Sequence, residues 1–231
     1  MELGRLEEAL AGYERAVAAR ADVPSAWNNR GAVLRRLHRL EAALASHERA
    51  LALAPGHVNA LINRGMVLKD LERTKEAEAA ADAALALQPD ASEALHLKSA
   101  IALETGRIGE AQGLFARLQQ AAPNHPAALN GLARAAALAC DWTTAQEITP
   151  ALLDAARFGS ALVQPMVLMG YCDDPALLRR AAETAIARSV PPHAPLPKVR
   201  YAHDLIRLAY VSADFHNHPT AALAADMFEP P

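Results

Sequence analysis

Apolar residues recur through the first ~140 residues with the spacing of amphipathic helices, and their pattern repeats every 34 residues. Three consecutive blocks, 24–57, 58–91 and 92–125, place small or apolar residues and a closing proline at the same seven positions. In the first block these are Trp27, Gly31, Leu34, Ala43, His47, Ala50 and Pro55, at block positions 4, 8, 11, 20, 24, 27 and 32. The first three share one face of a helix and the next three share one face of a second helix. The pattern therefore predicts a series of helical hairpins.

Partial units flank the three blocks. Ala9, Tyr13 and Ala16 match the second half of a preceding block, so residues 1–23 are expected to form half a repeat. Leu129 and Ala133 begin a fourth block, which is degenerate from residue 126 because its closing proline is absent. We expect the repeats to extend over residues 1–142.

The pattern changes twice after the repeats. Residues 143–190 keep a helical pattern without the 34-residue register, which predicts irregular linking helices. Residues 191–204 begin with PPHAPLP, in which four of seven residues are proline, and this composition is typical of an extended linker. A third segment, 205–231, follows this linker.

The 34-residue block resembles the tetratricopeptide repeat, with Arg30 where that pattern has leucine. The resemblance implies an all-α, right-handed superhelix in which the first helices of the pairs line the concave surface. Four asparagines at block positions 5 and 6 fall on these first helices: Asn28, Asn29, Asn63 and Asn130. Because an amide both donates and accepts hydrogen bonds, this set suits a bound peptide backbone, although solvated asparagines on a helix surface would give the same pattern.

Basic residues also recur on the first helices. Arg30, Arg64 and Lys98 occupy block position 7 in three successive blocks. Residues of this kind would be needed to clamp the carboxylate of a peptide terminus, but position 7 lies beside the expected buried seam. A carboxylate clamp is therefore a further hypothesis for these repeats.

Composition excludes several other functions. The 231 residues are 52% hydrophobic and carry a net charge of −3, which predicts a folded chain without nucleic-acid or membrane partners. Cys140 and Cys172 form no metal-binding or disulfide pattern, so a reduced, cytoplasmic setting is expected. The repeat histidines include no HExxH and no i,i+4 pair, which predicts no metal site. We expect protein or peptide partners on the concave repeat surface and no cofactor in this chain, and oligomerisation stays open.

The terminal segment has a different pattern. Residues 205–212, LIRLAYVS, alternate apolar and polar positions and are rich in β-branched and aromatic residues, which predicts a strand. The polar stretch ADFHNHP follows, and then a short helix from Thr220. Strand, loop and helix in this order open α/β nucleotide-binding domains.

The stretch 206–228 resembles the start of the catalytic region of protein O-GlcNAc transferases, including their bacterial SPINDLY-type relatives. The matching residues are Tyr210, Val211, Ser212, Asp214, Phe215, His218 and Pro219. The resemblance implies a truncated start of a GT-B domain, UDP-GlcNAc as the donor of the full-length family, and transfer to serine or threonine of proteins. It also implies that His218 is a base or a sugar-nucleotide contact, and that the asparagines hold protein substrates.

Two functions follow as expectations. In the first, the chain is the substrate-recruiting repeat region of such a transferase, inactive by itself because one strand and one helix form no sheet. The alternative is a non-enzymatic repeat scaffold for protein–protein interaction.

Overall fold

The computed structural model describes residues 2–159 and 163–189, and every regular element within these ranges is an α-helix. The helices are α1 (Glu2–Ala19), α2 (Pro24–Arg36), α3 (Leu40–Leu53), α4 (Val58–Asp70), α5 (Thr74–Leu87), α6 (Ser92–Glu104), α7 (Ile108–Ala121), α8 (Ala128–Leu138), α9 (Trp142–Phe158), α10 (Pro165–Leu168) and α11 (Pro175–Ser189). None of these helices has the length and apolarity needed to cross a membrane. The predicted linker and the predicted strand at 205–212 lie outside the described residues.

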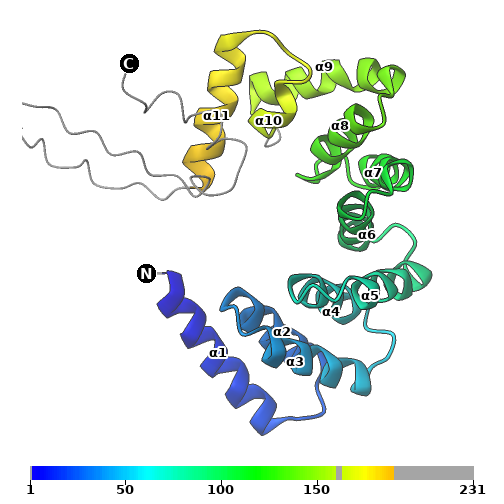
Figure 1. Ribbon diagram of the computed structural model, residues 1–231. Helices are drawn as coiled ribbons and strands as arrows, with labels where there is room; N and C mark the ends of the chain where they lie inside the picture. The colour runs from blue at the N-terminus through cyan, green and yellow to red at the C-terminus, as the bar shows by residue number, and fades with distance from the viewer. Residues whose placement is uncertain (1, 160–162, 190–231) are drawn as a thin grey trace, which may run out of the picture. The chain divides into compact units, whose positions relative to one another are not determined.

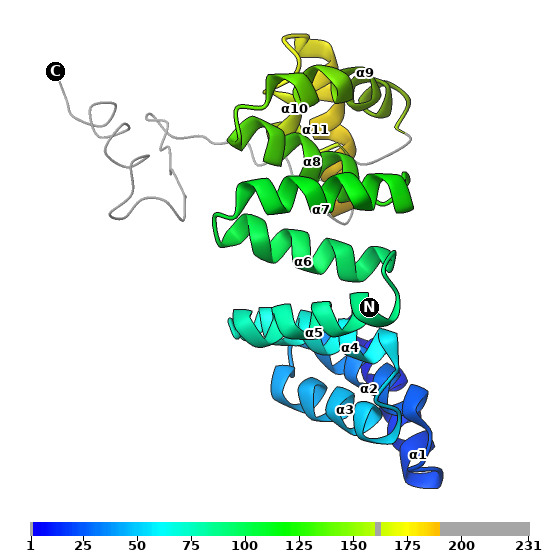
Figure 2. The same cartoon turned by 90° about the vertical axis from the view of Figure 1, so that its right-hand side faces the viewer.

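The helices follow the 34-residue blocks. Each block contains one antiparallel pair, α2 with α3, α4 with α5, and α6 with α7, and α1 packs against α2 (Figures 1 and 2). The fourth pair, α8 with α9, continues the stack, so the hairpin arrangement persists beyond the point where the closing proline is lost. The all-helical repeat architecture predicted from the pattern is confirmed.

The first helices of the pairs form a continuous row. Helix α2 contacts α4, α4 contacts α6, and α6 contacts α8, whereas no comparable contact joins the second helices α3, α5 and α7. Each second helix instead packs against the first helix of the next pair. We call the row of α2, α4, α6 and α8 the inner row.

Small residues let neighbouring helices approach closely, both within a pair and between successive pairs. A Cβ atom added to Gly31 in α2 would lie 2.5 Å from the ring of His47 in α3, inside van der Waals contact. A Cβ added to Gly65 in α4 would lie 2.6 Å from the side chain of Leu97 and 3.2 Å from the carbonyl oxygen of Ala77. Block position 8 is therefore the point where a side chain from another helix fills the space of a missing one.

His47 occupies block position 24, where the third block has Phe115, and its ring is completely buried. Its Nδ1 lies 3.2 Å from Oδ1 of Asn28, which also accepts a hydrogen bond from the amide of Asn63. Because this oxygen can only accept, Nδ1 carries the hydrogen and Nε2 is left buried without a hydrogen-bond partner. Burial, with a smaller contribution from the nearby charge of Arg35, lowers the pKa of His47 to about 4. The ring is thus a neutral core residue.

The turn within each pair has the same backbone conformation in all four pairs. Residues at block position 15 have positive φ: His38 (55°), Glu72 (60°), Gly106 (77°) and Cys140 (53°). The amide of the next residue donates to a carbonyl oxygen five residues back, as from Arg39 to Leu34 at 2.9 Å and from Arg107 to Ala102 at 2.8 Å. This bond closes the C-terminus of the first helix, in the manner of a Schellman motif.

Helices α10 and α11 extend the stack beyond the fourth pair. Helix α10 contacts α8, and α11 contacts α9. The hydroxyl of Tyr171, just after α10, donates to the carbonyl oxygen of Ala133 in α8 at 2.6 Å. The short helix α10 is therefore fixed beside the last helix of the inner row.

The turn conformation predicts opposite effects for two glycines of the third pair. Gly106→Ala is expected to lower the free energy of unfolding by about 1 kcal/mol, because alanine at positive φ is strained. Gly113→Ala, on the exposed face of α7 with no atom near the added methyl group, is expected to raise it by about 1 kcal/mol. Urea unfolding of both variants measures the difference, and a loss of stability in both, or in neither, contradicts the assignment of the turn.

The burial of His47 predicts a pH-dependent stability. In the unfolded chain its pKa is near 6.5, so between pH 6.5 and 4 the unfolded state binds a proton that the folded state excludes. The free energy of unfolding should therefore fall as the pH falls, with about 2 kcal/mol lost to this group at pH 5.

Urea unfolding at pH 7.5 and pH 5 measures this loss. His47→Phe should remove that part of the pH dependence, whereas His38→Asn, at an exposed turn position that asparagine tolerates, should keep it. An unchanged pH dependence in His47→Phe would show that the ring is protonated or solvated in the folded state.

Candidate functional site

Two of the four predicted asparagines lie together on the inner row. Asn28 in α2 is 6% exposed, and its Oδ1 accepts a hydrogen bond from Nδ2 of Asn63 in α4 at 3.0 Å. The same oxygen faces His47, so Asn28 joins the core to the surface of the inner row. Asn63 is half-buried and keeps its own carbonyl oxygen for other partners.

The other two asparagines lie apart from this pair. Asn29 is exposed on α2. Asn130 in α8 is 6% exposed, donates to the carbonyl oxygen of Pro126 at 3.0 Å and accepts from the amide of Gln164 at 2.8 Å, which fixes the start of α10. In the third block the position of Asn29 and Asn63 is taken by Leu97, which is buried. The amides therefore form a pair and two single positions.

The three recurring basic residues are paired with acids. The distances between the side-chain nitrogen and the carboxylate oxygen are 3.4 Å for Arg30 and Glu14, 3.9 Å for Arg64 and Glu48, and 2.6 Å for Lys98 and Asp82. Each acid lies 16 residues before its partner, on the preceding second helix, so the same ion pair recurs between successive hairpins. These cations are engaged within the chain, which speaks against a carboxylate clamp at position 7.

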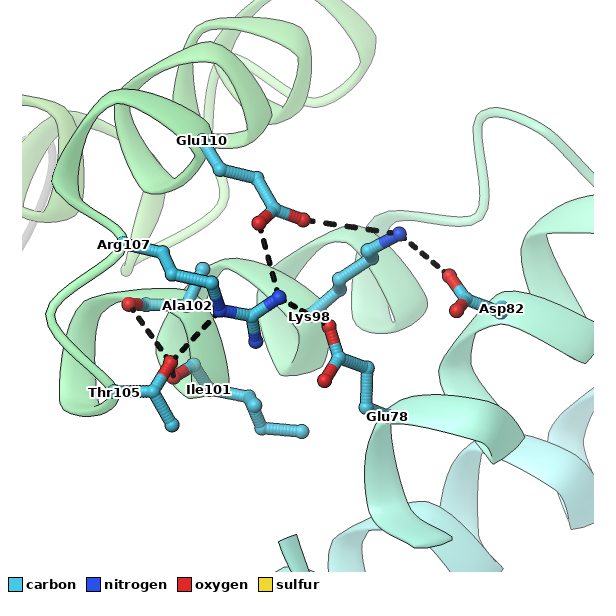
Figure 3. A network of polar contacts seen from close by, with 8 residues as sticks. All are labelled: Glu78, Asp82, Lys98, Ile101, Ala102, Thr105, Arg107 and Glu110. Atoms are coloured by element: carbon cyan, nitrogen blue, oxygen red, sulfur yellow. Dashed lines mark hydrogen bonds and ion pairs between the residues drawn. The ribbon is translucent and has the colours of Figure 1, made fainter. Parts of the chain in front are cut away.

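A wider polar network surrounds the third of these pairs. Lys98 lies between Asp82 and Glu110, and the guanidinium of Arg107 reaches both Glu110 and Glu78 (Figure 3). The residues come from α5, α6, α7 and the turn before α7. These partly exposed pairs contribute little stability one by one, and they fix the register between hairpins.

A second set of ion pairs lies along the inner row. Arg35 lies 2.6 Å from Asp70, and Lys69 lies 2.7 Å from Glu104, each pair joining neighbouring first helices. Between α6 and α8, the next two first helices, the equivalent block positions carry Leu103 and Leu138 in place of a charged pair. The inner row therefore changes from paired charges to an apolar surface as it reaches α8.

Two adjoining hollows lie at this apolar end, and the sequence pattern did not indicate either one. The larger, about 370 Å³, lies between α8 and α10, and the smaller, about 150 Å³, lies between α6 and α8. Arg134 and Gln164 line both hollows. The apolar lining of the larger one includes Leu138, Met166, Val167 and Tyr171.

Arg134 differs from the other cations of the inner row. It is exposed, and within 2–159 and 163–189 no carboxylate pairs with it. The side chain of Met166, 80% exposed, stands on the other side of the larger hollow. The site thus combines an unpaired positive charge, an apolar wall and the amide of Gln164, a combination suited to binding a peptide segment.

His218 and the other residues that resemble the transferase motif lie outside the described residues. The sequence pattern did not predict the larger hollow, because one of its walls comes from α10, which lies beyond the 34-residue register. Arg134 itself carried a signal, since it is a charged residue at an inward position of the fourth block where the earlier blocks have Ala32, Met66 and Ala100.

Comparisons with solved structures place the fold among repeat proteins. PilF of Pseudomonas aeruginosa matches with a TM-score of 0.62 and 18% identity, covering 82% of this chain and 86% of its own. MamA of Desulfovibrio magneticus matches with a TM-score of 0.59 and 21% identity, and the match covers 67% of this chain and 87% of the MamA chain. YrrB is described as a TPR protein with an unusual peptide-binding site. It matches with a TM-score of 0.52 and 22% identity, and the match covers 79% of this chain and 86% of the YrrB chain. At these identities the likeness shows the fold.

Family models give the same result over the repeats. No curated protein sequence matches the chain significantly. Two family models described as tetratricopeptide repeat match residues 22–90 and residues 62–126. Together with the helical hairpins and their 34-residue spacing, these matches identify residues 22–126 as tetratricopeptide repeats.

Proposed function

We propose that this protein is an interaction scaffold that binds an extended segment of a partner protein along the inner row. The observation that carries the proposal is the pair of hollows beside α8, which are both lined by Arg134, a residue with which no carboxylate of the described residues pairs. YrrB, a repeat protein of similar fold, is described as having a peptide-binding site, and this description supports the proposal.

The chemistry of the hollows defines the segment that fits best. The larger hollow is mainly apolar, and its volume of about 370 Å³ suits one large apolar side chain, with Met166 and Leu138 as adaptable walls. Arg134 would pair with a carboxylate next to that side chain, because it lines both hollows. We infer a segment in which a large apolar residue adjoins Asp, Glu or a terminal carboxylate.

The asparagines would act further along the same row. Asn29 is exposed, and Asn63 has a free carbonyl oxygen, so both can bond to a peptide backbone without regard to its side chains. Asn28 would hold Asn63 in place through their 3.0 Å hydrogen bond. Asn130 would act indirectly, because it fixes Gln164 at the edge of the hollows.

Selection of a displayed peptide library against the full chain tests the proposal. Selected peptides should contain a large apolar residue beside an acidic residue or the terminal carboxylate. Arg134→Ala should weaken their binding about tenfold in fluorescence anisotropy, because a charge-assisted hydrogen bond is lost.

Arg49→Ala is the matched control. Arg49 is an exposed arginine on the second helix α3, away from the inner row, so its removal changes the net charge equally and should leave the affinity unchanged. Equal weakening by both variants would indicate a general charge effect, and no weakening by Arg134→Ala would place the peptide site elsewhere.

A second candidate function rests on the sequence of residues 206–228. In this case the repeats would recruit protein substrates to an O-GlcNAc transferase whose catalytic region begins near Tyr210, with His218 at its sugar-nucleotide site and UDP-GlcNAc as donor. The resemblance of this stretch supports the candidate, whereas the family matches are to repeats.

Transcript sequencing beyond codon 231 separates the two candidates. The transferase candidate expects an open frame that continues into several hundred residues with alternating strand and helix patterns, including phosphate-binding elements. A stop codon at that point would contradict it and leave the scaffold.

A further inference from the structure

Three potential metal ligands meet at the start of α6. Glu93 and His96 lie three residues apart in the first turns of α6, and His125 comes from the turn between α7 and α8. One ligand atom of each lies within 4.8 Å of those of the other two. Nε2 of His125 is 3.4 Å from Oε1 of Glu93, and the two imidazole rings have centroids 5.1 Å apart.

We propose that Glu93, His96 and His125 bind one divalent transition-metal ion, with Zn²⁺ as the best-fitting ion. Two imidazole nitrogens and one carboxylate oxygen are a common ligand set for zinc, and three protein ligands leave one coordination position open. The inference does not rest on the proposed peptide binding, although His96 also lines the smaller hollow.

The distances suit a tetrahedral ion after a small adjustment. Metal–ligand bonds of about 2.1 Å separate neighbouring ligands of a tetrahedral site by about 3.4 Å. The His125–Glu93 separation of 3.4 Å already has this value. The His96 ring, which is half-buried, has to move its ligand nitrogen inward from a separation of up to 4.8 Å, and Glu93, which is exposed, is free to follow.

The helix spacing supports the arrangement. Residues three apart project from the same face of a helix, so Glu93 and His96 point toward one position. The Glu-x-x-His spacing provides metal ligands in helical di-iron proteins for the same reason. The two histidines of this site are not four residues apart on one helix, so the sequence pattern did not indicate it. The third ligand, His125, comes from a turn 29 residues after His96.

The charges around the site are compatible with a bound cation. Glu93 places a carboxylate beside the two imidazole rings. Lys69 also faces His96, but its ammonium group is paired with Glu104 at 2.7 Å. The residual positive charge near the site is therefore reduced.

His125 must change its hydrogen bonding when the metal binds. Its Nδ1 accepts a hydrogen bond from the amide of Ala127 at 3.2 Å, so the proton of the neutral ring is on Nε2, facing Glu93. Coordination of the metal through Nε2 moves this hydrogen to Nδ1 and breaks the hydrogen bond from the amide of Ala127. The metal–nitrogen bond that forms offsets this loss in part. We therefore expect micromolar affinity, which is weaker than that of preformed zinc sites.

The repeats contain a matched control for this site. His57 has the same block position as His125, and its Nδ1 likewise accepts from a backbone amide, that of Ala60 at 3.1 Å. Its block has Ser25 and Asn28 where the third block has Glu93 and His96. His57 therefore accepts a backbone hydrogen bond at the start of the next first helix, as His125 does, without the other two ligands.

Isothermal calorimetry of the full chain with zinc chloride, at neutral pH, tests the proposal. The wild-type protein should bind one more Zn²⁺ than His96→Ala, and Glu93→Gln should weaken this site at least tenfold without affecting the fold. His125→Asn should remove the site while the asparagine side chain can still accept a hydrogen bond from the backbone of the turn, whereas His57→Asn should bind as the wild type does. Cobalt in place of zinc should give the visible absorption of a tetrahedral ion in the wild type and in His57→Asn, and not in His96→Ala or His125→Asn.

The comparison of variants separates this site from zinc bound elsewhere on the chain, such as at the histidines after residue 190. Equal stoichiometry and affinity in the wild type, Glu93→Gln and His96→Ala would overturn the proposal. A loss in His57→Asn as large as that in His125→Asn would also overturn it, because it would show that capping alone matters. Circular dichroism confirms that each variant is folded.

Discussion

The close approach of two helices over a position without a side chain is the contact on which the rest of this structure depends. At block position 8, Gly31 leaves room for the ring of His47, and Gly65 leaves room for Leu97. A wider separation would open the hairpins and remove the burial of the alanine-rich helices, which have little side-chain volume to spare. The same contact places the first helices next to one another and forms the inner row.

Under the proposed function, the charges of the inner row decide where a peptide would bind. Its charges are largely used between hairpins, in pairs such as Arg30 with Glu14 and Lys69 with Glu104, so most of the surface offers no free charge for a partner. At α8 these pairs end, and Arg134, which pairs with no carboxylate among residues 2–159 and 163–189, lines two hollows. This change from internal pairing to an apolar surface beside Arg134 is the reason for proposing this end of the inner row as the binding site.

The sequence predicts the helices well because a hairpin repeat is a local structure. Residues that recur at fixed block positions, such as Gly31 and Pro55, mark its register. It does not predict features made by residues distant in the chain. The larger hollow needs α10, and the proposed metal site needs a turn residue, His125, beside α6. His47 lies at a helix contact, as its block position predicts, but its bond to Asn28 and the pairing of Asn28 with Asn63 depend on how α2, α3 and α4 pack together.

Hydrogen–deuterium exchange of the full chain, with and without a selected peptide, tests most directly whether partners bind at the inner row. The account predicts slower exchange in α6, α8 and residues 163–171, which surround the two hollows, with little change in the second helices α3 and α5. Slower exchange confined to α3, α5 and α7 would contradict it, because binding would then be on the opposite helices.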